Sequence, residues 1–189
     1  EGLLKKCGFQ SSGLFVMDGS RRSSHGNAYF TGFGKSKRIV FFDTLINKHS
    51  PEEIEAVLAH ELGHFKLKHV FKLTCFLVLV SLVFFALLGT LQQSAFIHEA
   101  LNLHAFGSPS LLLAAFYFGL PPFLFLFRPL FAAYLRKNEF EADAYAAQQA
   151  PAQELIKALI KLYKDNSSTL TPDKLYSAFY DSHPPASAR

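Results

Sequence analysis

The sequence predicts a mainly α-helical integral membrane protein with a small antiparallel β-sheet and two transmembrane helices. Half of the 189 residues are hydrophobic, 21 are Phe, and none is Trp. The hydrophobic residues gather in two long uncharged blocks, a distribution typical of membrane spans. A region before these blocks has strand-like runs separated by turn residues. The net charge of +4 comes from short basic groups beside the apolar blocks, so we expect no nucleic-acid partner.

Residues 1–70 are expected to form the small sheet and one long helix. The segment Glu1–Gly8 resembles the end of a helix, and no signal peptide is present, so we expect a fragment that lacks an N-terminal part. Three strand-like runs follow, at residues 13–17, 27–31 and 38–42. Ser50, Pro51 and Glu53 then fit the N-cap, the first helical position and the capping box of a helix that could run past Lys72.

Two segments are predicted to cross a membrane, one within residues 71–92 and one within residues 111–137. Leu73–Leu91 is 19 residues without a formal charge, enough for a hydrocarbon core of about 30 Å. Leu111–Phe127 is also uncharged and contains Pro121-Pro122, which predicts a kink. The alternative is a pair of buried helices in a large soluble domain, but such helices rarely lack charges for so long.

The flanking charges predict the orientation of these spans. Lys and Arg residues precede the first span and follow the second, whereas the connector at residues 93–110 has none. The positive-inside rule therefore places the connector on the far side and both outer ends on the cytoplasmic face, in a bacterial inner membrane or the endoplasmic reticulum. Residues 138–189 return to a soluble composition and are expected to be helical.

The motif His60-Glu61-Leu62-Gly63-His64 predicts a zinc site. Two His residues four positions apart lie on one face of a helix, so both imidazoles can reach one ion. Glu61 projects to a neighbouring face, from which it can act as a general base on water without ligating the metal. The alternative is a coincidental pair of surface histidines. We favour the metal site because the motif lies in the well-capped helix that the mechanism needs.

The third metal ligand is predicted to be Glu139. Glu139 and Asp143 lie one turn apart on one helical face, so Asp143 can hydrogen-bond the far nitrogen of a ligating His, for which we expect His60. Two spans between the histidines and Glu139 would return the chain to the same side of the membrane. A charged helix turn at a membrane exit is the alternative interpretation of this acidic run.

Five segments together resemble the type I CAAX prenyl proteases, which are membrane zinc endopeptidases. They are residues 25–32 (HGNAYFTG), 37–45 (KRIVFFDTL), 57–64 (VLAHELGH), 139–144 (EFEADA), and 182–185 (SHPP) with Arg189 following. The resemblance implies a zincin-like catalytic domain on a ring of transmembrane helices, of which this chain supplies two. It also implies one zinc ion per chain, a prenylated protein or peptide as substrate, and contact with a lipid bilayer.

The resemblance further implies roles for residues outside the metal site. Asn27, Ala28 and Tyr29 resemble the strand beside which substrate lies as an added β-strand. His183 and Arg189 resemble residues that stabilise the oxyanion of the tetrahedral intermediate. Gly26 departs from the family pattern, since many members have Ser at this position.

Two other functions remain open from the sequence. An HtpX-type quality-control protease shares the two-His motif and a downstream Glu, but degrades damaged membrane proteins; residues 25–32 and 182–185 favour the CAAX type. A membrane scaffold with a structural zinc site is the non-enzymatic alternative. The presence of Glu61 argues against a scaffold, because a structural site has no use for that carboxylate.

Overall fold

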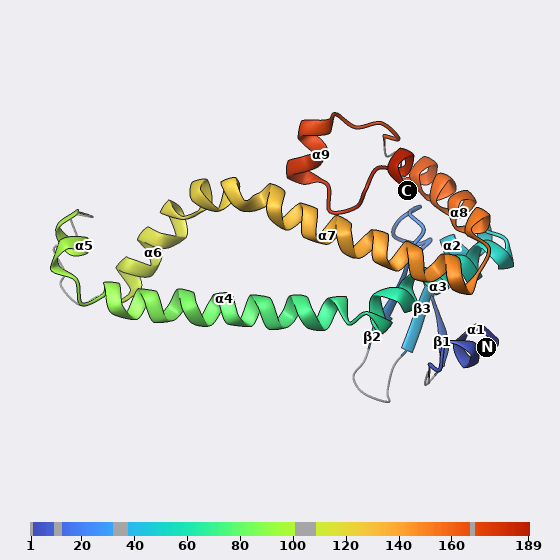
Figure 1. Cartoon of the computed structure of the whole chain (residues 1–189), viewed down its shortest axis with the longest axis horizontal. Helices are drawn as coiled ribbons and strands as arrows, with labels where there is room; N and C mark the ends of the chain where they lie inside the picture. Colours follow the sequence, from blue (N-terminus) through green and yellow to red (C-terminus); the bar gives the residue numbers. More distant parts are fainter. Residues whose placement is uncertain (1, 10–12, 32–37, 101–108, 167–168) are drawn as a thin grey trace. The chain divides into compact units, whose positions relative to one another are not determined.

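The computed structural model describes residues 2–9, 13–31, 38–100, 109–166 and 169–189, and it is mainly helical (Figure 1). The chain divides into two compact units. One consists of Glu1–Lys68 together with Ala132–Arg189, and the other of His69–Phe131.

The first unit begins with the short helix α1 (Gly2–Lys6), which ends as expected just before Gly8. Gly8 has φ 65°, a left-handed conformation that glycine adopts without steric penalty. The N–H groups of Cys7 and Phe9 donate to the carbonyls of Leu3 and Leu4 and so close the helix end. Leu3 and Leu4 are buried in the core of this unit.

The sheet is mixed, so the prediction of a wholly antiparallel sheet is wrong. Strands β1 (Leu14–Met17), β2 (Ala28–Thr31) and β3 (Arg38–Phe42) lie in the order β1-β3-β2. β2 pairs with β3 antiparallel, but β1 pairs with β3 parallel.

Asp43 explains the parallel pairing. This residue directly follows β3, and its Oδ1 accepts hydrogen bonds of 3.0 Å from the N–H groups of both Gly19 and Ser20, just after β1. The carboxyl ends of the two strands are therefore held together, and β1 must run in the same direction as β3. Because β3 lies between β1 and β2, residues 18–27 connect β1 to the strand on the other side of β3 instead of forming a hairpin between consecutive strands.

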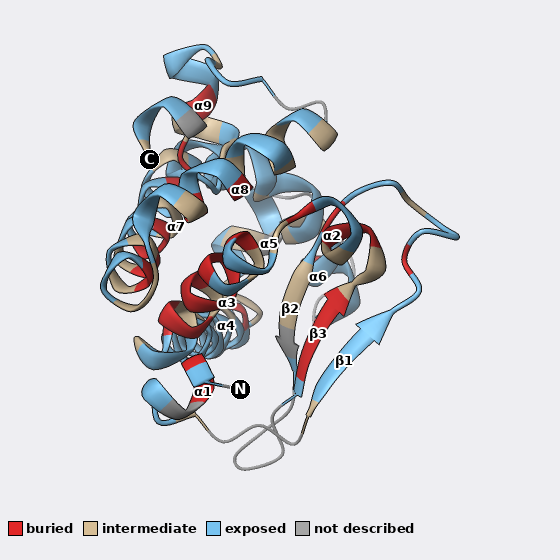
Figure 2. Ribbon diagram, turned by 90° about the vertical axis from the view of Figure 1, so that its right-hand side faces the viewer, coloured by how far each residue is buried: buried red, intermediate tan, exposed pale blue. Residues whose placement is uncertain are grey.

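β3 is the buried strand of the sheet. Its residues Ile39, Val40 and Phe41 are buried, whereas all four residues of β1 are exposed (Figure 2). β3 is followed by α2 (Asp43–Lys48) and then by α3 (Pro51–Lys66), the helix that carries the two-His motif.

The start of α3 is confirmed, but its predicted extension past Lys72 is wrong. Ser50 Oγ accepts from the N–H of Glu53, and the Glu53 carboxylate accepts from the N–H of Ser50, which completes the capping box. At the other end Lys68 takes a left-handed conformation with φ 58°, so a new helix, α4 (His69–Leu91), begins after it.

The second unit contains α4, α5 (Ala95–Ala100), α6 (Pro109–Gly119) and the first part of α7 (Pro121–Gln149). By length and composition, α4 can cross a membrane. α6 and α7 pass the same test as one pair, bent by 54° at the break beside Pro121-Pro122. Residues 101–108 of the expected connector lie outside the described residues.

The remaining helices complete the first unit. α7 continues through residue 137 without a break and ends at Gln149, followed by α8 (Ala152–Asp165), α9 (Lys174–Tyr180) and a 3-10 turn at Ala186–Ala188. α3 packs against α8 and the sheet. The core is formed by buried residues of α1, β3, α2, α3, α7 and α8: Leu3, Leu4, Ile39, Phe41, Leu45, Ala56, Leu58, Ala59, Leu62, Ala146 and Leu155.

Candidate metal centre

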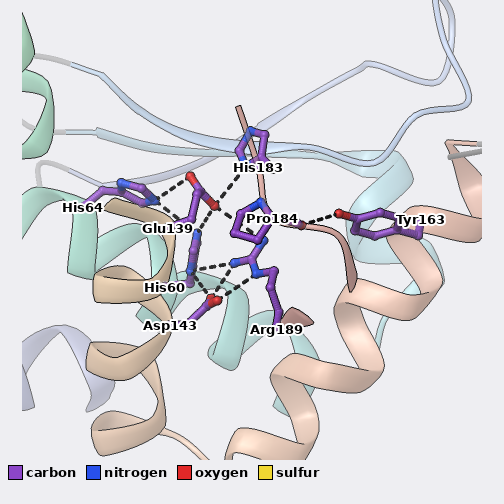
Figure 3. Close-up of polar contacts among 8 residues, drawn as sticks. All are labelled: His60, His64, Glu139, Asp143, Tyr163, His183, Pro184 and Arg189. Atoms are coloured by element: carbon purple, nitrogen blue, oxygen red, sulfur yellow. Dashed lines mark hydrogen bonds and ion pairs between the residues drawn. The ribbon is translucent and has the colours of Figure 1, made fainter. Parts of the chain in front are cut away.

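His60 and His64 lie on one face of α3 and point toward Glu139 of α7 (Figure 3). The Nε2 atoms of the two imidazoles are 3.2 Å apart. Oε2 of Glu139 is 3.5 Å from His60 Nε2, and Oε1 is 3.3 Å from His64 Nε2. Among the described residues these three form a group whose donor atoms could hold a metal ion.

Gly63 allows α7 to come this close to α3. A Cβ atom placed on Gly63 would lie 3.0 Å from Cα and 3.1 Å from the carbonyl oxygen of Ala142. The two helices therefore touch through backbone atoms at the turn that separates Glu139 from Asp143. A larger residue at position 63 would push α7 away and so separate Glu139 and Asp143 from the imidazoles.

The arrangement fits a tetrahedral zinc ion. With zinc bonds of about 2.0–2.1 Å, two ligands of such an ion lie about 3.3 Å apart, close to the three separations given above. Glu139 Oε2 is buried, and no group in the described part of the chain donates it a well-aligned hydrogen bond. His183 Nδ1 is 2.9 Å from this oxygen, but not in hydrogen-bond alignment. A cation would satisfy a buried carboxylate oxygen of this kind.

Asp143 lies behind His60, on the side away from Glu139. Its Oδ1 is 2.9 Å from His60 Nδ1, so the carboxylate can fix the imidazole with Nε2 free to ligate. Arg189 in turn forms two hydrogen bonds with Asp143: Arg189 Nε donates to Oδ2 at 2.7 Å, and Nη2 donates to Oδ1. Arg189 Nη1 is also 3.5 Å from Glu139 Oε2.

These contacts change the pKa values of the groups. Burial alone would lower the pKa of His60, but the carboxylates of Asp143 and Glu139 raise it to about 9. Burial would raise the pKa of Glu139, but its close contacts with the imidazoles of His183, His60 and His64 hold it far below its usual value. Without metal His60 therefore carries a proton at neutral pH, which a bound ion must displace.

Glu61 faces the same space as the metal-site residues. A cavity of about 550 Å³ is lined by Asn27, His60, Glu61, Glu139, His183 and Arg189, together with residues of α8 and α9. Burial raises the pKa of the Glu61 carboxyl. Six of the ten residues singled out in the sequence line this cavity. Two more, His64 and Asp143, contact Glu139 and His60, which line it.

Ala28 and Tyr29 lie in β2, next to Asn27, and are not among the residues that line the cavity. Asn27 is exposed, and its Oδ1 accepts a hydrogen bond of 2.8 Å from the N–H of Ala28. β2 pairs with β3 along one edge, and no other described strand covers its second edge.

The structure also adds residues that the sequence did not single out for this site. Tyr163 of α8 donates its hydroxyl to the carbonyl of Pro184, beside His183. Arg136 of α7 donates to two carbonyls at the end of α9. Tyr163 lies in an ordinary amphipathic helix, and Arg136 has the position of a membrane-flanking charge, so neither gives a distinctive sequence signal.

A comparison with protein families identifies the relationship that this geometry suggests. The model of peptidase family M48 matches residues 1–189. The chain belongs to peptidase family M48.

Several relatives of this M48 chain share the name CAAX prenyl protease 1. It is 38% identical to CAAX prenyl protease 1 of Saccharomyces cerevisiae over 100% of its own length and 45% of that protein. It is 40% identical to the CAAX prenyl protease 1 homolog of Arabidopsis thaliana, covering 98% of this chain and 44% of the relative. The human homolog is 34% identical, with coverages of 98% and 47%.

A solved structure is also similar. The crystal structure of S. mikatae Ste24p matches with a TM-score of 0.87 and 35% identity, over 99% of this chain and 47% of that one. The chain therefore spans slightly less than half the length of the curated relatives it matches.

Proposed function

We propose that this M48 chain is the catalytic part of a membrane-embedded zinc metalloendopeptidase that processes the C-terminus of prenylated CAAX proteins or peptides. The observation that supports this most directly is the convergence of His60, His64 and Glu139 beside a cavity that Glu61 also lines. The names of the relatives support the substrate class.

The residues of the chain divide the work of peptide hydrolysis. His60, His64 and Glu139 would hold zinc, and Asp143 would keep the His60 ring in the ligating tautomer. When bound, zinc supplies Lewis-acid chemistry that acidifies water and polarises a carbonyl.

Glu61 takes the proton of the attacking water and later delivers it to the leaving amine. Its raised pKa suits this role, because a general base works best when its pKa approaches the operating pH. His183, whose side chain is 64% exposed, can donate to the oxyanion. Arg189 would also help to stabilise the oxyanion through its positive charge, although its guanidinium is held by hydrogen bonds to Asp143.

The free edge of β2 is proposed to bind the substrate backbone as an added strand. The N–H of Phe42 donates to the carbonyl of Asn27 at 2.9 Å, so by strand alternation the N–H and carbonyl of Ala28 point away from β3. A substrate carbonyl would take over the Ala28 N–H from the Asn27 side chain, and Tyr29 continues the strand.

The membrane arrangement is part of the same proposal. α4 would form one span, and α6 with the apolar part of α7 a second, kinked span. The sheet, α3 and the C-terminal helices would make a zincin-like domain on the cytoplasmic face. The expected division into residues 1–70, 71–92, 93–110, 111–137 and 138–189 follows from this arrangement.

The test is cleavage of a farnesylated CAAX peptide by the full-length protein in detergent. We expect release of the terminal tripeptide, and we expect Glu61→Gln to retain stoichiometric zinc while losing most turnover. Full turnover by the Glu61→Gln variant would refute the assigned role of Glu61. Cleavage of denatured membrane proteins without regard to their C-terminus would instead indicate a quality-control protease.

A further inference from the structure

Arg136 has a structural partner that its position in the sequence does not suggest. It lies on α7 one turn before Glu139, and residues three apart on a helix are neighbours on its surface. Its Nη1 donates to the carbonyls of Ser177 and Asp181, at 3.0 and 2.9 Å. The helix that carries the third ligand therefore also holds the end of α9.

α9 has little apolar packing to hold it in place. It is seven residues long, and of its residues only Ser177 is buried, whereas Leu175, Tyr176 and Tyr180 are exposed. At the end of α9 the N–H of Asp181 donates to the carbonyl of Ser177 at 3.1 Å. Arg136 is a second donor to that carbonyl and also donates to the carbonyl of Asp181, where the chain leaves α9 for the metal site.

His183 follows this anchor by two residues and is held again on its other side. The hydroxyl of Tyr163 donates to the carbonyl of Pro184 at 2.9 Å (Figure 3), and the Pro184 side chain is fully buried. Between these anchors the largely exposed His183 side chain places Nδ1 2.9 Å from Glu139 Oε2. Its place over the metal ligand is thus set by backbone anchors rather than by burial of the imidazole.

We propose that Arg136 is a positioning residue, which acts through the carbonyl of Asp181 to hold His183 beside Glu139. This inference rests on the proposed peptidase function, because it assigns Arg136 to the same reaction. It differs from a purely membrane-flanking role, in which any exposed positive charge at this level of α7 would serve.

Lys137 provides a matched control. It is the next residue on α7, carries the same charge, has a side chain that is 73% exposed, and pairs with Glu141 at 3.7 Å. Lys137→Gln removes one positive charge from the same turn of the helix and leaves the carbonyls of α9 untouched. Arg136→Gln removes the same charge together with both hydrogen bonds.

The kinetic test uses the full-length zinc-loaded protein and the farnesylated CAAX peptide. We expect Arg136→Gln to lower kcat about 10- to 100-fold, since displacement of a catalytic group by about 1 Å can have an effect of this size. KM should change less than about threefold, and Arg136→Lys should recover part of the loss. Lys137→Gln should leave kcat unchanged.

A double-mutant cycle shows whether Arg136 acts through His183. In a His183→Ala background, Arg136→Gln should lower kcat by less than about twofold further, because the group that it positions is gone. An equal fold-loss in both backgrounds, or no loss in the wild-type background, would overturn the proposal.

Amide hydrogen exchange tests the same anchor without any activity. Arg136→Gln should speed exchange at residues 177–183 at least about tenfold while leaving α3 unchanged, and Lys137→Gln should have no effect. Unchanged exchange in Arg136→Gln would overturn the proposal even if the peptide is cleaved. Faster exchange in a protein that does not cleave the peptide would instead show that the anchor exists and the proposed substrate is wrong.

Discussion

A methyl group added at residue 63 would collide with the backbone of α7. Its carbon would lie 3.0 Å from Ala142 Cα, 3.1 Å from Ala142 O and 3.2 Å from Tyr145 Cβ. Contacts of a Cβ atom are rarely this short, so α7 must give by a few tenths of an ångström to accommodate Gly63→Ala. Trimming a side chain cannot relieve this clash, because two of the three atoms belong to the backbone.

The expected result of Gly63→Ala is a loss of zinc affinity with the ligands intact. Overpacking of this kind costs about 1–3 kcal/mol. If the metal-free protein relaxes by moving α7 away, zinc must pull the helix back, which corresponds to roughly 5- to 150-fold weaker binding. Competition with a chromophoric chelator measures this affinity directly.

The control is Gly89→Ala on α4, where an added Cβ meets nothing within 4 Å. This change should leave zinc affinity unaltered, because it removes no ligand and moves no helix of the metal site. Wild-type affinity in Gly63→Ala would refute the conclusion that backbone contact between α3 and α7 sets the ligand spacing.

Three further predictions concern charge and metal. Asp143→Asn should weaken zinc binding about 10- to 100-fold, as measured by metal competition, because it removes the carboxylate that orients His60. Zinc binding at neutral pH should release about one proton per ion, since the pKa of His60 is about 9 without metal. Calorimetry in buffers of different ionisation enthalpy would measure this proton release, which should disappear at pH values well above the pKa of His60. Glu53→Gln should destabilise the protein by about 1 kcal/mol at neutral pH. Burial would raise the pKa of Glu53, but Lys161 and the Ser50 N–H lower it overall, so the wild-type advantage should vanish in thermal melts as pH falls below that pKa.

The local elements could be predicted from the sequence because short-range chemistry determines them. The capping box at Ser50 and the stop at Gly8 depend on residues within one helical turn. The spacing of His60 and His64 places them on one face of α3 for the same reason. Glu139 could be proposed because its motif lies on a helix and the chain between has two apolar blocks.

The rest depends on contacts that no periodicity encodes. The direction of β1 is set by Asp43, which binds a turn 24 residues away. The end of α3 depends on one left-handed residue, Lys68, although Lys has no special preference for that conformation. The anchors of His183 come from Arg136 and Tyr163, whose residue types are common at ordinary surface positions.

The distribution of the proposed metal ligands along the chain has a consequence for biosynthesis. The first two proposed ligands are His60 and His64, and the third is Glu139, 75 residues after His64. A ribosome that adds roughly 5–20 residues per second needs roughly 4–15 s to make that interval. During this time the nascent chain carries His60 and His64 but lacks the Glu139 carboxylate, so the site cannot be completed until both apolar segments have been synthesised.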